Sequence, residues 1–249
     1  MLKKRVIPIL LLKNNKLVKS INFKNFQYVG NPLNTSVSLY KQDADEICIL
    51  NIDSKDDYNI NNSIDILKTI IKNCFIPITY GGNLKNFEDI SFCFDSGIDK
   101  VALNSICYSN TKILEKVVQF YGSQALTAVI DFKIVDGNPV LFSSFAKIAE
   151  KISLEEHVCN LLKNGVSEII FQNIDNDGKM SGCEYLNKLN LNRFKINKIV
   201  VGGIGNYGHA LEIFSDFNVE AIGCGSLFSF SDSNPIRLKS FLKNNKVLA

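Results

Sequence analysis

Small and polar residues recur in pairs that could hold a phosphate group. They form four groups: Gly81-Gly82-Asn83, Asn104-Ser105, Gly202-Gly203 and Gly225-Ser226. Glycine lets backbone N–H groups approach an anion closely, and a serine hydroxyl or a helix N-terminus adds donors. The sequence therefore predicts two phosphate-binding clusters, one in each half of the chain. A tight turn between a strand and a helix explains any single Gly-Gly pair equally well.

Two carboxylate motifs lie among these groups. Asp131 ends the apolar run 128–130, where partial burial raises the pKa of a carboxyl towards neutrality and suits it to general acid or base catalysis. A salt bridge with Lys133 is the simpler alternative. The turn 175–178 contains Asp177 and Gly178, which could hold sugar hydroxyls or border the second phosphate, or merely form an Asx turn.

Four charged residues stand where otherwise apolar runs begin: Arg5, Glu46, Lys100 and Glu168. Charges that face the interior of a protein are costly unless they are paired. Two cations and two anions therefore indicate a mutually compensating ring. Alternatively, individual members point to solvent.

Eight short apolar runs, each followed by a polar turn and a stretch of helical periodicity, position these residues. The runs are 5–11, 46–51, 76–80, 100–103, 125–131, 168–172, 198–202 and 220–223. Nearly continuous apolar runs that alternate with helices are typical of parallel strands buried on both faces. We expect eight strands alternating with eight helices, and longer loops over 14–31 and 132–152.

The chain repeats itself at a spacing of 120 to 122 residues. Glu46-Ile47 recurs as Glu168-Ile169, and Gly81-Gly82 recurs as Gly202-Gly203. Each half, about 1–122 and 123–249, then supplies four β/α units, and closure removes the exposed edges of two half-barrels. We predict a (β/α)8 TIM barrel with a two-fold internal half-barrel repeat, with an open doubly wound sheet as the alternative. Ligands of such barrels bind at the C-terminal ends of the strands. The repeat aligns Asp131 with Leu11, which cannot transfer a proton.

Composition narrows the classes of function. The 249 residues are 46% apolar, which favours one domain over 1–249. The net charge of +3 gives no indication of binding to nucleic acid or to a membrane. Seven cysteines without a C-x-x-C pair indicate a reduced, cytoplasmic protein. The two histidines, His157 and His209, lack ligand spacing, so we expect no metal site and no cofactor.

Together these residues closely resemble the cyclase subunit of imidazole glycerol phosphate synthase, the barrel that pairs with a glutaminase in histidine biosynthesis. The resemblance covers almost the whole chain. It rests on 4–8, Lys19 with Asn22-Phe23, 99–101 before Asn104, 121–125, 130–131 with 135–137, and 175–178 with Ser181-Gly182.

The resemblance implies that a glutaminase docks at the N-terminal face of the barrel and releases ammonia there. Arg5, Glu46, Lys100 and Glu168 match the gate that the ammonia passes. At the opposite face, a substrate with two phosphate ends is aminated, cleaved and cyclised, with two rim aspartates as acid and base. Asp131 matches one of them, Leu11 stands at the other, and Lys19 joins the substrate-binding residues.

Departures from the family pattern cluster at the reaction site. Asn83 replaces the third glycine of a Gly-Gly-Gly, Asn51 replaces an aspartate, Val201 replaces a serine, and 145–150 replaces a glycine-rich, lysine-containing segment. Leu11 alone should cost about 10²–10⁴-fold in rate. This pattern predicts a barrel that conducts ammonia to another amidation, such as amidination of surface sugars. A working cyclase of histidine biosynthesis, another phosphosugar enzyme on the same scaffold and a regulatory, non-catalytic partner of the glutaminase are the alternatives.

Overall fold

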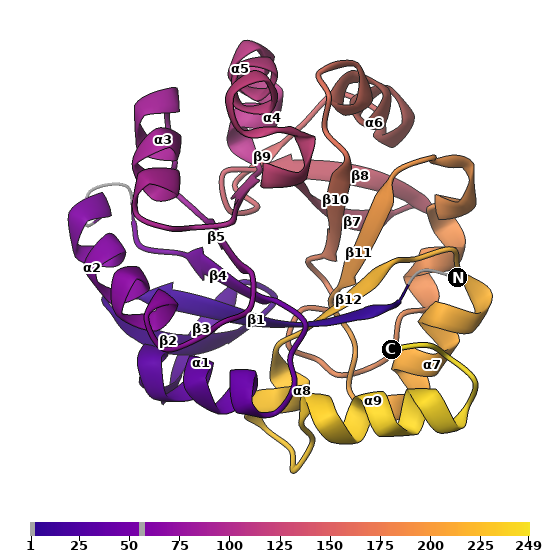
Figure 1. Cartoon of the computed structure of the whole chain (residues 1–249). Coiled ribbons are helices and arrows are strands. Elements are labelled where there is room, and N and C mark those ends of the chain that lie inside the picture. The colour runs from indigo at the N-terminus through magenta and orange to yellow at the C-terminus, as the bar shows by residue number, and fades with distance from the viewer. Residues whose placement is uncertain (1–2, 55–57) are drawn as a thin grey trace.

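Eight parallel strands close into a barrel in the computed structural model, which describes residues 3–54 and 58–249 (Figure 1). In order around the barrel they are β1 (Arg5–Lys13), β4 (Ile47–Asn51), β5 (Ile78–Gly81), β6 (Lys100–Leu103), β7 (Leu126–Val135), β10 (Glu168–Asn173), β11 (Asn197–Val201) and β12 (Ala221–Cys224). β7 pairs with β10, and β12 pairs with β1. The predicted (β/α)8 barrel is confirmed, and the open sheet is excluded because this sheet closes on itself.

Helices surround the barrel (Figure 1). They are α1 (Pro32–Lys41), α2 (Ile60–Ile71), α3 (Phe87–Asp95), α4 (Ser105–Ser109), α5 (Thr111–Tyr121), α6 (Leu154–Lys163), α7 (Tyr207–Asp216), α8 (Ser226–Ser229) and α9 (Pro235–Asn244), with 3-10 turns η1 (Ser123–Ala125), η2 (Glu184–Lys188) and η3 (Leu191–Arg193). Six α-helices begin at an Asn or Ser whose side chain accepts a hydrogen bond from the first turn: Asn31, Asn59, Asn86, Ser153, Asn206 and Asn234.

The expectation of an α-helix after every strand was wrong after β10. That connection contains only η2 and η3 among its helical segments. Asparagine is a poor helix former, and the segment 187–192 contains three of them. Asn190 moreover adopts the left-handed conformation, with φ 46°, which interrupts a right-handed helix.

The expected long loops were also wrong in part, because they contain antiparallel strands. β1 continues into the hairpin β2 (Lys16–Ile21) and β3 (Lys24–Gly30), and β7 continues into β8 (Asn138–Ser143), which pairs with β9 (Ile148–Ala149). Two-residue turns with positive φ at both positions, Asn14-Asn15 and Asp136-Gly137, reverse the chain. Such turns match the twist of the strands they join.

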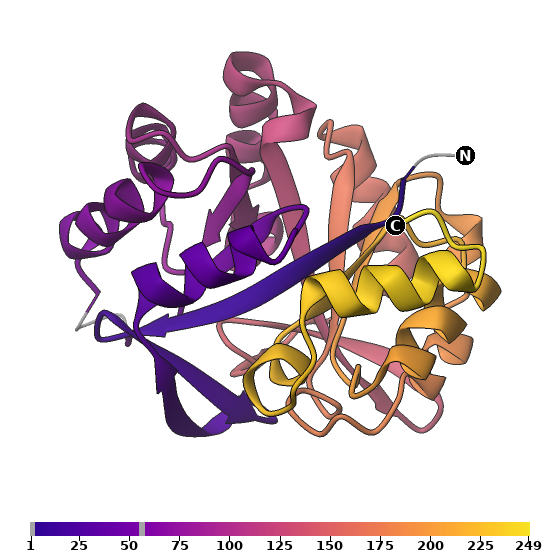
Figure 2. The same cartoon turned by 60° about the horizontal axis from the view of Figure 1, so that its bottom comes forward.

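The hairpins and the termini lie at different ends of the barrel. In Figure 2 the β2–β3 hairpin, in indigo, extends from the bottom of the molecule, whereas β1 starts at the upper right, near the C-terminus. The backbone N–H of Lys4 donates to the carbonyl of Leu248 over 2.7 Å, so the two ends of the chain meet. The hairpins therefore extend the C-terminal ends of the barrel strands, where ligands bind in this fold.

Alternation along each strand decides which residues enter the barrel. On β1, Val6, Leu10 and Leu12 pack in the large cluster between sheet and helices, whereas Ile7 and Ile9 belong to a separate inner cluster. Because side chains alternate with a period of two, Arg5 and Leu11 face inward with the inner cluster. β1 thus carries four inward residues, from Arg5 at the lowest level through Ile7 and Ile9 to Leu11 at the mouth.

Candidate functional site

The lowest inward level is a ring of ion pairs. Arg5 Nη1 lies 3.0 Å from Glu46 Oε2, and Arg5 Nη2 donates to Glu168 Oε2. Lys100 Nζ lies 2.9 Å from Glu46 and 3.1 Å from Glu168. Each cation thus contacts both anions, and the four charges that the sequence singled out come together at the N-terminal ends of the strands.

Hydroxyl groups complete the ring. Thr79 Oγ1 donates to Glu46 over 2.6 Å, and Thr127 Oγ1 donates to Glu168 over 3.0 Å. Burial by itself raises the pKa of Glu168, but Lys100 and Arg5 outweigh it and hold that pKa below its usual range. Glu168 is therefore ionised at neutral pH, and the paired ring lies across the lower end of the barrel.

The middle level is apolar. Its residues form one cluster: Ile7, Ile9, Cys48, Ala102, Val129, Ile170, Ile199, Val201 and Ala221. Burial raises the pKa of the Cys48 thiol, which keeps it neutral at physiological pH. A lining without charge strongly disfavours ions, because an unpaired ion in an apolar medium is poorly solvated.

The upper level forms the mouth. Leu11 and Asp131 lie on strands that stand four apart in the ring of eight, so they face each other across the barrel. Asp131 is 7% exposed, and its neighbour in register on β10 is Gln172. Gln172 lines the same pocket as Leu11. The predicted site residue thus stands at the mouth with a methyl-bearing side chain opposite.

Asp131 has few polar partners. Asn104 Nδ2 donates to it over 3.4 Å, and Lys133 instead lies 3.6 Å from Asp175, so the predicted alternative of a Lys133 salt bridge does not form. Burial raises the pKa of Asp131 to about 7, and the Asp177 carboxylate adds to the rise. A carboxyl that titrates near the working pH can both take up and release a proton.

A pocket beside Leu11 brings together the predicted binding residues of the second half and Lys19 from the first half. Its lining includes Lys19, Asp177, Gly178, Gly202, Gly203, Gly225 and Ser226, with Leu11, Gln172 and Met180 among the others. The free volume is about 20 Å³, which is room for a single water molecule. A phosphate group therefore requires one of these side chains to move.

Lys19 is the side chain that fills the pocket. Its Nζ donates to the carbonyl of Ile9 over 3.3 Å and lies so close to Gly225 that a Cβ on that glycine would stand 1.7 Å away. Burial lowers the pKa of Lys19 and raises that of Asp177, and the attraction between the two groups opposes both shifts. Ser20 Oγ donates to Asp177 over 2.9 Å.

The predicted cluster of the first half is held differently. A Cβ on Gly82, whose φ is 94°, would lie 1.9 Å from the carbonyl oxygen of Asn51. The Asn83 carboxamide donates to Asn51 and to the carbonyl of Asp53, over 3.3 and 2.9 Å. Gly81 approaches β6 as closely, since a Cβ there would lie 2.4 Å from the Ala102 carbonyl.

The other two residues of that cluster face the β8–β9 connection. Asn104 donates to the carbonyls of Val129 and Phe142, over 3.0 and 3.3 Å. Ser105 Oγ accepts from the backbone N–H of Ser144 over 3.0 Å. The geometry therefore ties 81–83 to the end of β4 and 104–105 to the end of β8.

The β2–β3 hairpin covers the mouth. The N–H of Asn22 donates to the carbonyl of Asp177 over 3.0 Å, and the rings of Phe23 and Phe145 stack with centroids 5.1 Å apart. Phe26 packs on the same ring at 6.3 Å. Loops from three strands thus meet over the cavity.

Sequence reasoning missed Gln172 and Ser20. Gln172 is 5% exposed, lies in register with Asp131, points inward and lines the pocket. The sequence does contain a signal for it, since an amide two residues after a buried isoleucine lies on the same face of the strand. Ser20 left no such signal, because its role depends on a hairpin that folds back onto Asp177.

Comparison with known proteins agrees with this geometry. Residues 5–233 match the histidine biosynthesis protein family. The chain is 30% identical over 249 residues to imidazole glycerol phosphate synthase subunit HisF of Flavobacterium johnsoniae, a match covering 99% of this chain and 98% of the relative. The chain belongs to the HisF family.

Other HisF relatives are similar over comparable lengths. Identity is 32% to subunit HisF of a Hydrogenobaculum species, over 99% of this chain and 98% of the relative. It is 31% to a relative of Pseudomonas aeruginosa that carries the designation hisF2, over 99% of both chains.

The described residues form neither a metal centre nor a membrane-spanning helix. Within 3–54 and 58–249, no group of three His, Cys, Asp or Glu side chains could hold a metal ion. No helix in the same ranges is long and apolar enough to cross a membrane. All seven cysteines are free; Cys159 is exposed and the other six are buried.

Proposed function

We propose that this HisF family member receives ammonia from a glutaminase subunit at its N-terminal face and conducts it to the C-terminal mouth for an amidation other than the cyclase reaction. Amidination of a surface sugar is one such use. The observation that carries the proposal is Leu11: the ring and the apolar interior persist, whereas Asp131 at the mouth faces a side chain that cannot transfer a proton.

The lower levels support the ammonia path. The ring excludes solvent from the N-terminal end while its members stay paired, and the apolar level above it favours neutral NH₃ over ammonium. Rearrangement of Arg5 or Lys100 would open the entrance without leaving a glutamate unpaired, because each glutamate contacts both cations.

Two exposed phenylalanines support a partner at that end. Phe75 is 79% exposed in the segment before β5, and Phe120 is 64% exposed at the end of α5, shortly before β7. Both segments lead into the N-terminal ends of barrel strands. Large exposed aromatic side chains are enriched at protein interfaces.

The mouth supports divergence from the cyclase reaction. Leu11 lines the pocket with Lys19 and Asp177, so an Asp at this position would face the ligand. A cyclase that needs one acid and one base loses about 10²–10⁴-fold when either is absent. Free, mostly buried thiols are consistent with a reducing compartment, and cytoplasmic localisation remains a prediction.

A working cyclase of histidine biosynthesis is the second candidate, favoured by the pKa of Asp131 near 7 and by a second, half-buried carboxyl, Asp177, whose pKa burial also raises. In this arrangement Asp177 would take the part that Leu11 cannot.

An assay of purified chain with ammonium salt and the phosphoribulosyl aminoimidazole substrate separates these functions. We expect turnover near background for the native chain and a rise of at least about tenfold for Leu11→Asp, with Leu11→Asn as the control for size and polarity. Efficient native turnover that falls in Asp177→Asn would instead establish the second candidate.

Glutaminase measurements test the partner independently. Mixing the native chain with the glutaminase subunit should stimulate glutamine hydrolysis. Glu46→Ala should then alter ammonia delivery but not glutaminase binding. A regulatory, non-catalytic partner predicts that this substitution leaves ammonia delivery unchanged.

A further inference from the structure

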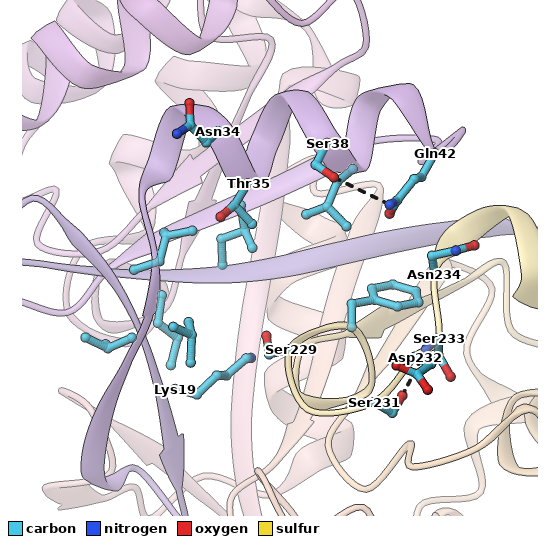
Figure 3. A pocket seen from close by; sticks show the side chains of 17 residues that line it. Lys19, Asn34, Thr35, Ser38, Gln42, Ser229, Ser231, Asp232, Ser233 and Asn234 are labelled. Carbon is cyan, nitrogen blue, oxygen red and sulfur yellow. Dashed lines mark hydrogen bonds between the residues drawn. The ribbon is translucent and has the colours of Figure 1, made fainter.

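A cleft of about 470 Å³ lies on the outer side of β1, apart from the pocket at the mouth (Figure 3). This volume is within the range of small-molecule sites, about 300–1,000 Å³. Its polar lining consists of Lys19, Asn34, Thr35, Ser38, Gln42, Ser229, Ser231, Asp232, Ser233 and Asn234. Aliphatic and aromatic side chains, including Leu17, Leu39 and Phe228, complete it.

Two elements fix the width of the cleft. α1 forms one wall, and the segment from α8 to the start of α9 forms the other, with Lys19 between them (Figure 3). Lys239 on α9 lies 3.1 Å from Asp43 and 2.8 Å from Asp45, in the turn that follows α1. This buried lysine holds α9 to the far end of α1, so the cleft is built into the fold.

The polar side chains of the cleft have both donors and acceptors that are free to form hydrogen bonds. Among the described residues, the Asn34 carboxamide and the Thr35 hydroxyl have no hydrogen-bond partner. Ser229 Oγ donates to Gly225 over 3.1 Å, which leaves its acceptor positions, and Ser38 Oγ accepts from Gln42 over 3.4 Å, which leaves its proton. The cleft therefore offers donors and acceptors side by side.

The charges of the cleft are balanced. Among the described residues of the lining, Lys19 is the only cation and Asp232 the only anion. Lys19 is already engaged with the carbonyl of Ile9. A phosphate requires a concentration of donors and a metal ion requires a concentration of acceptors, and the cleft provides neither.

We propose that the cleft binds a neutral carbohydrate or polyol of about the size of a pyranose ring. Each hydroxyl of such a ligand both donates and accepts, as the walls require, and its C–H face would pack on Leu39 and Phe228. Leu11 and Lys19 line both this cleft and the pocket at the mouth, so the ligand would lie next to the end of the ammonia path. The proposal does not depend on that path.

The test is protein-observed NMR titration of the full chain. The probes are glycerol, N-acetylglucosamine and the methyl α-pyranosides of glucose, galactose and mannose, with glucose 6-phosphate as the anionic probe. We expect at least one neutral probe to shift the backbone resonances of Asn34, Thr35, Ser229 and Asp232 in a saturable manner.

Two variants locate the binding. Ser38→Phe fills the cleft and should abolish the shifts, and Thr69→Phe, at an exposed position of α2, is the matched control that should not. Thr35→Val keeps the shape and removes one hydroxyl, and should weaken binding by about threefold to tenfold. The proposal is overturned if no neutral probe shifts these resonances, if Ser38→Phe binds as well as the native chain, or if only glucose 6-phosphate binds.

Discussion

The environment of Asp131 predicts how the stability of this barrel depends on pH. Burial raises the pKa of this carboxyl to about 7 in the folded chain. An unfolded chain returns it to about 3.9. Between these two values the folded state holds a proton that the unfolded state has released, so stability is lost as pH rises from about 4 to 7. Asp131→Asn removes this titration while keeping the shape of the side chain.

The size of the effect follows from the shift. One pKa unit corresponds to about 1.4 kcal/mol, so a shift of about three units costs the native chain on the order of 4 kcal/mol above pH 7 and about 1.5 kcal/mol at pH 5. The stability of Asp131→Asn relative to the native chain should therefore rise by about 2.5 kcal/mol between pH 5 and pH 8.

Equilibrium urea denaturation measures this difference. The chain contains no tryptophan, so far-ultraviolet circular dichroism is the suitable signal. Asp65→Asn, at an exposed position of α2, controls for the loss of one negative charge. A difference between Asp131→Asn and the native chain that stays constant from pH 5 to pH 8, or that shrinks as pH rises, would refute the reasoning.

Three further predictions concern the ring, the first glycine cluster and the docking face. Glu168→Ala should lower the free energy of unfolding by about 3–5 kcal/mol, because Arg5 and Lys100 each lose a partner. Adding Lys100→Met should cost less than the sum of both changes by at least about 1 kcal/mol in a denaturation cycle, and strict additivity would argue against a coupled ring. Gly82→Ala should destabilise more than Gly97→Ala in thermal unfolding, since both glycines have φ near 95° but only Gly82 meets a backbone oxygen at 1.9 Å; equal losses would contradict the close approach. Phe120→Asp should reduce glutaminase stimulation at least about tenfold, whereas Phe230→Asp near the opposite end should not, and equal effects would place the partner elsewhere.

Strand positions could be predicted because buried parallel strands leave an unbroken apolar run. The same signal does not predict the hairpins, since β3 has no fully buried residue and its sequence is typical of a polar loop. One clue was present: Asp136-Gly137 is a residue pair that favours a two-residue hairpin turn. The turn Asn22-Phe23 gives no such clue, because a phenylalanine with φ 61° is held there by its stack on Phe145.

The ring could be predicted from charge alone, and the pocket only in part. Arg5, Glu46, Lys100 and Glu168 stand at equivalent points of four strands, so closing the barrel necessarily brings them together. The position of Lys19 depends instead on how a hairpin folds back over the mouth. Contacts between loops are set by conformations that the period of a strand does not encode.

Comparing β4 with β10 shows how the two halves differ along the barrel axis. Their inward residues are Glu46 and Glu168 at the lowest level, apolar at the middle level, and Leu50 and Gln172 at the mouth. The glutamates are interchangeable because each must neutralise the same two cations, so replacing either one breaks the shared network. At the mouth the two halves are linked by hydrogen bonds, such as the one from Asn104 to Asp131 over 3.4 Å, and the Leu11 side chain takes no part in them. A leucine opposite Asp131 therefore leaves the ring of ion pairs intact. Loss of a charged residue of the ring would instead leave its partners unpaired.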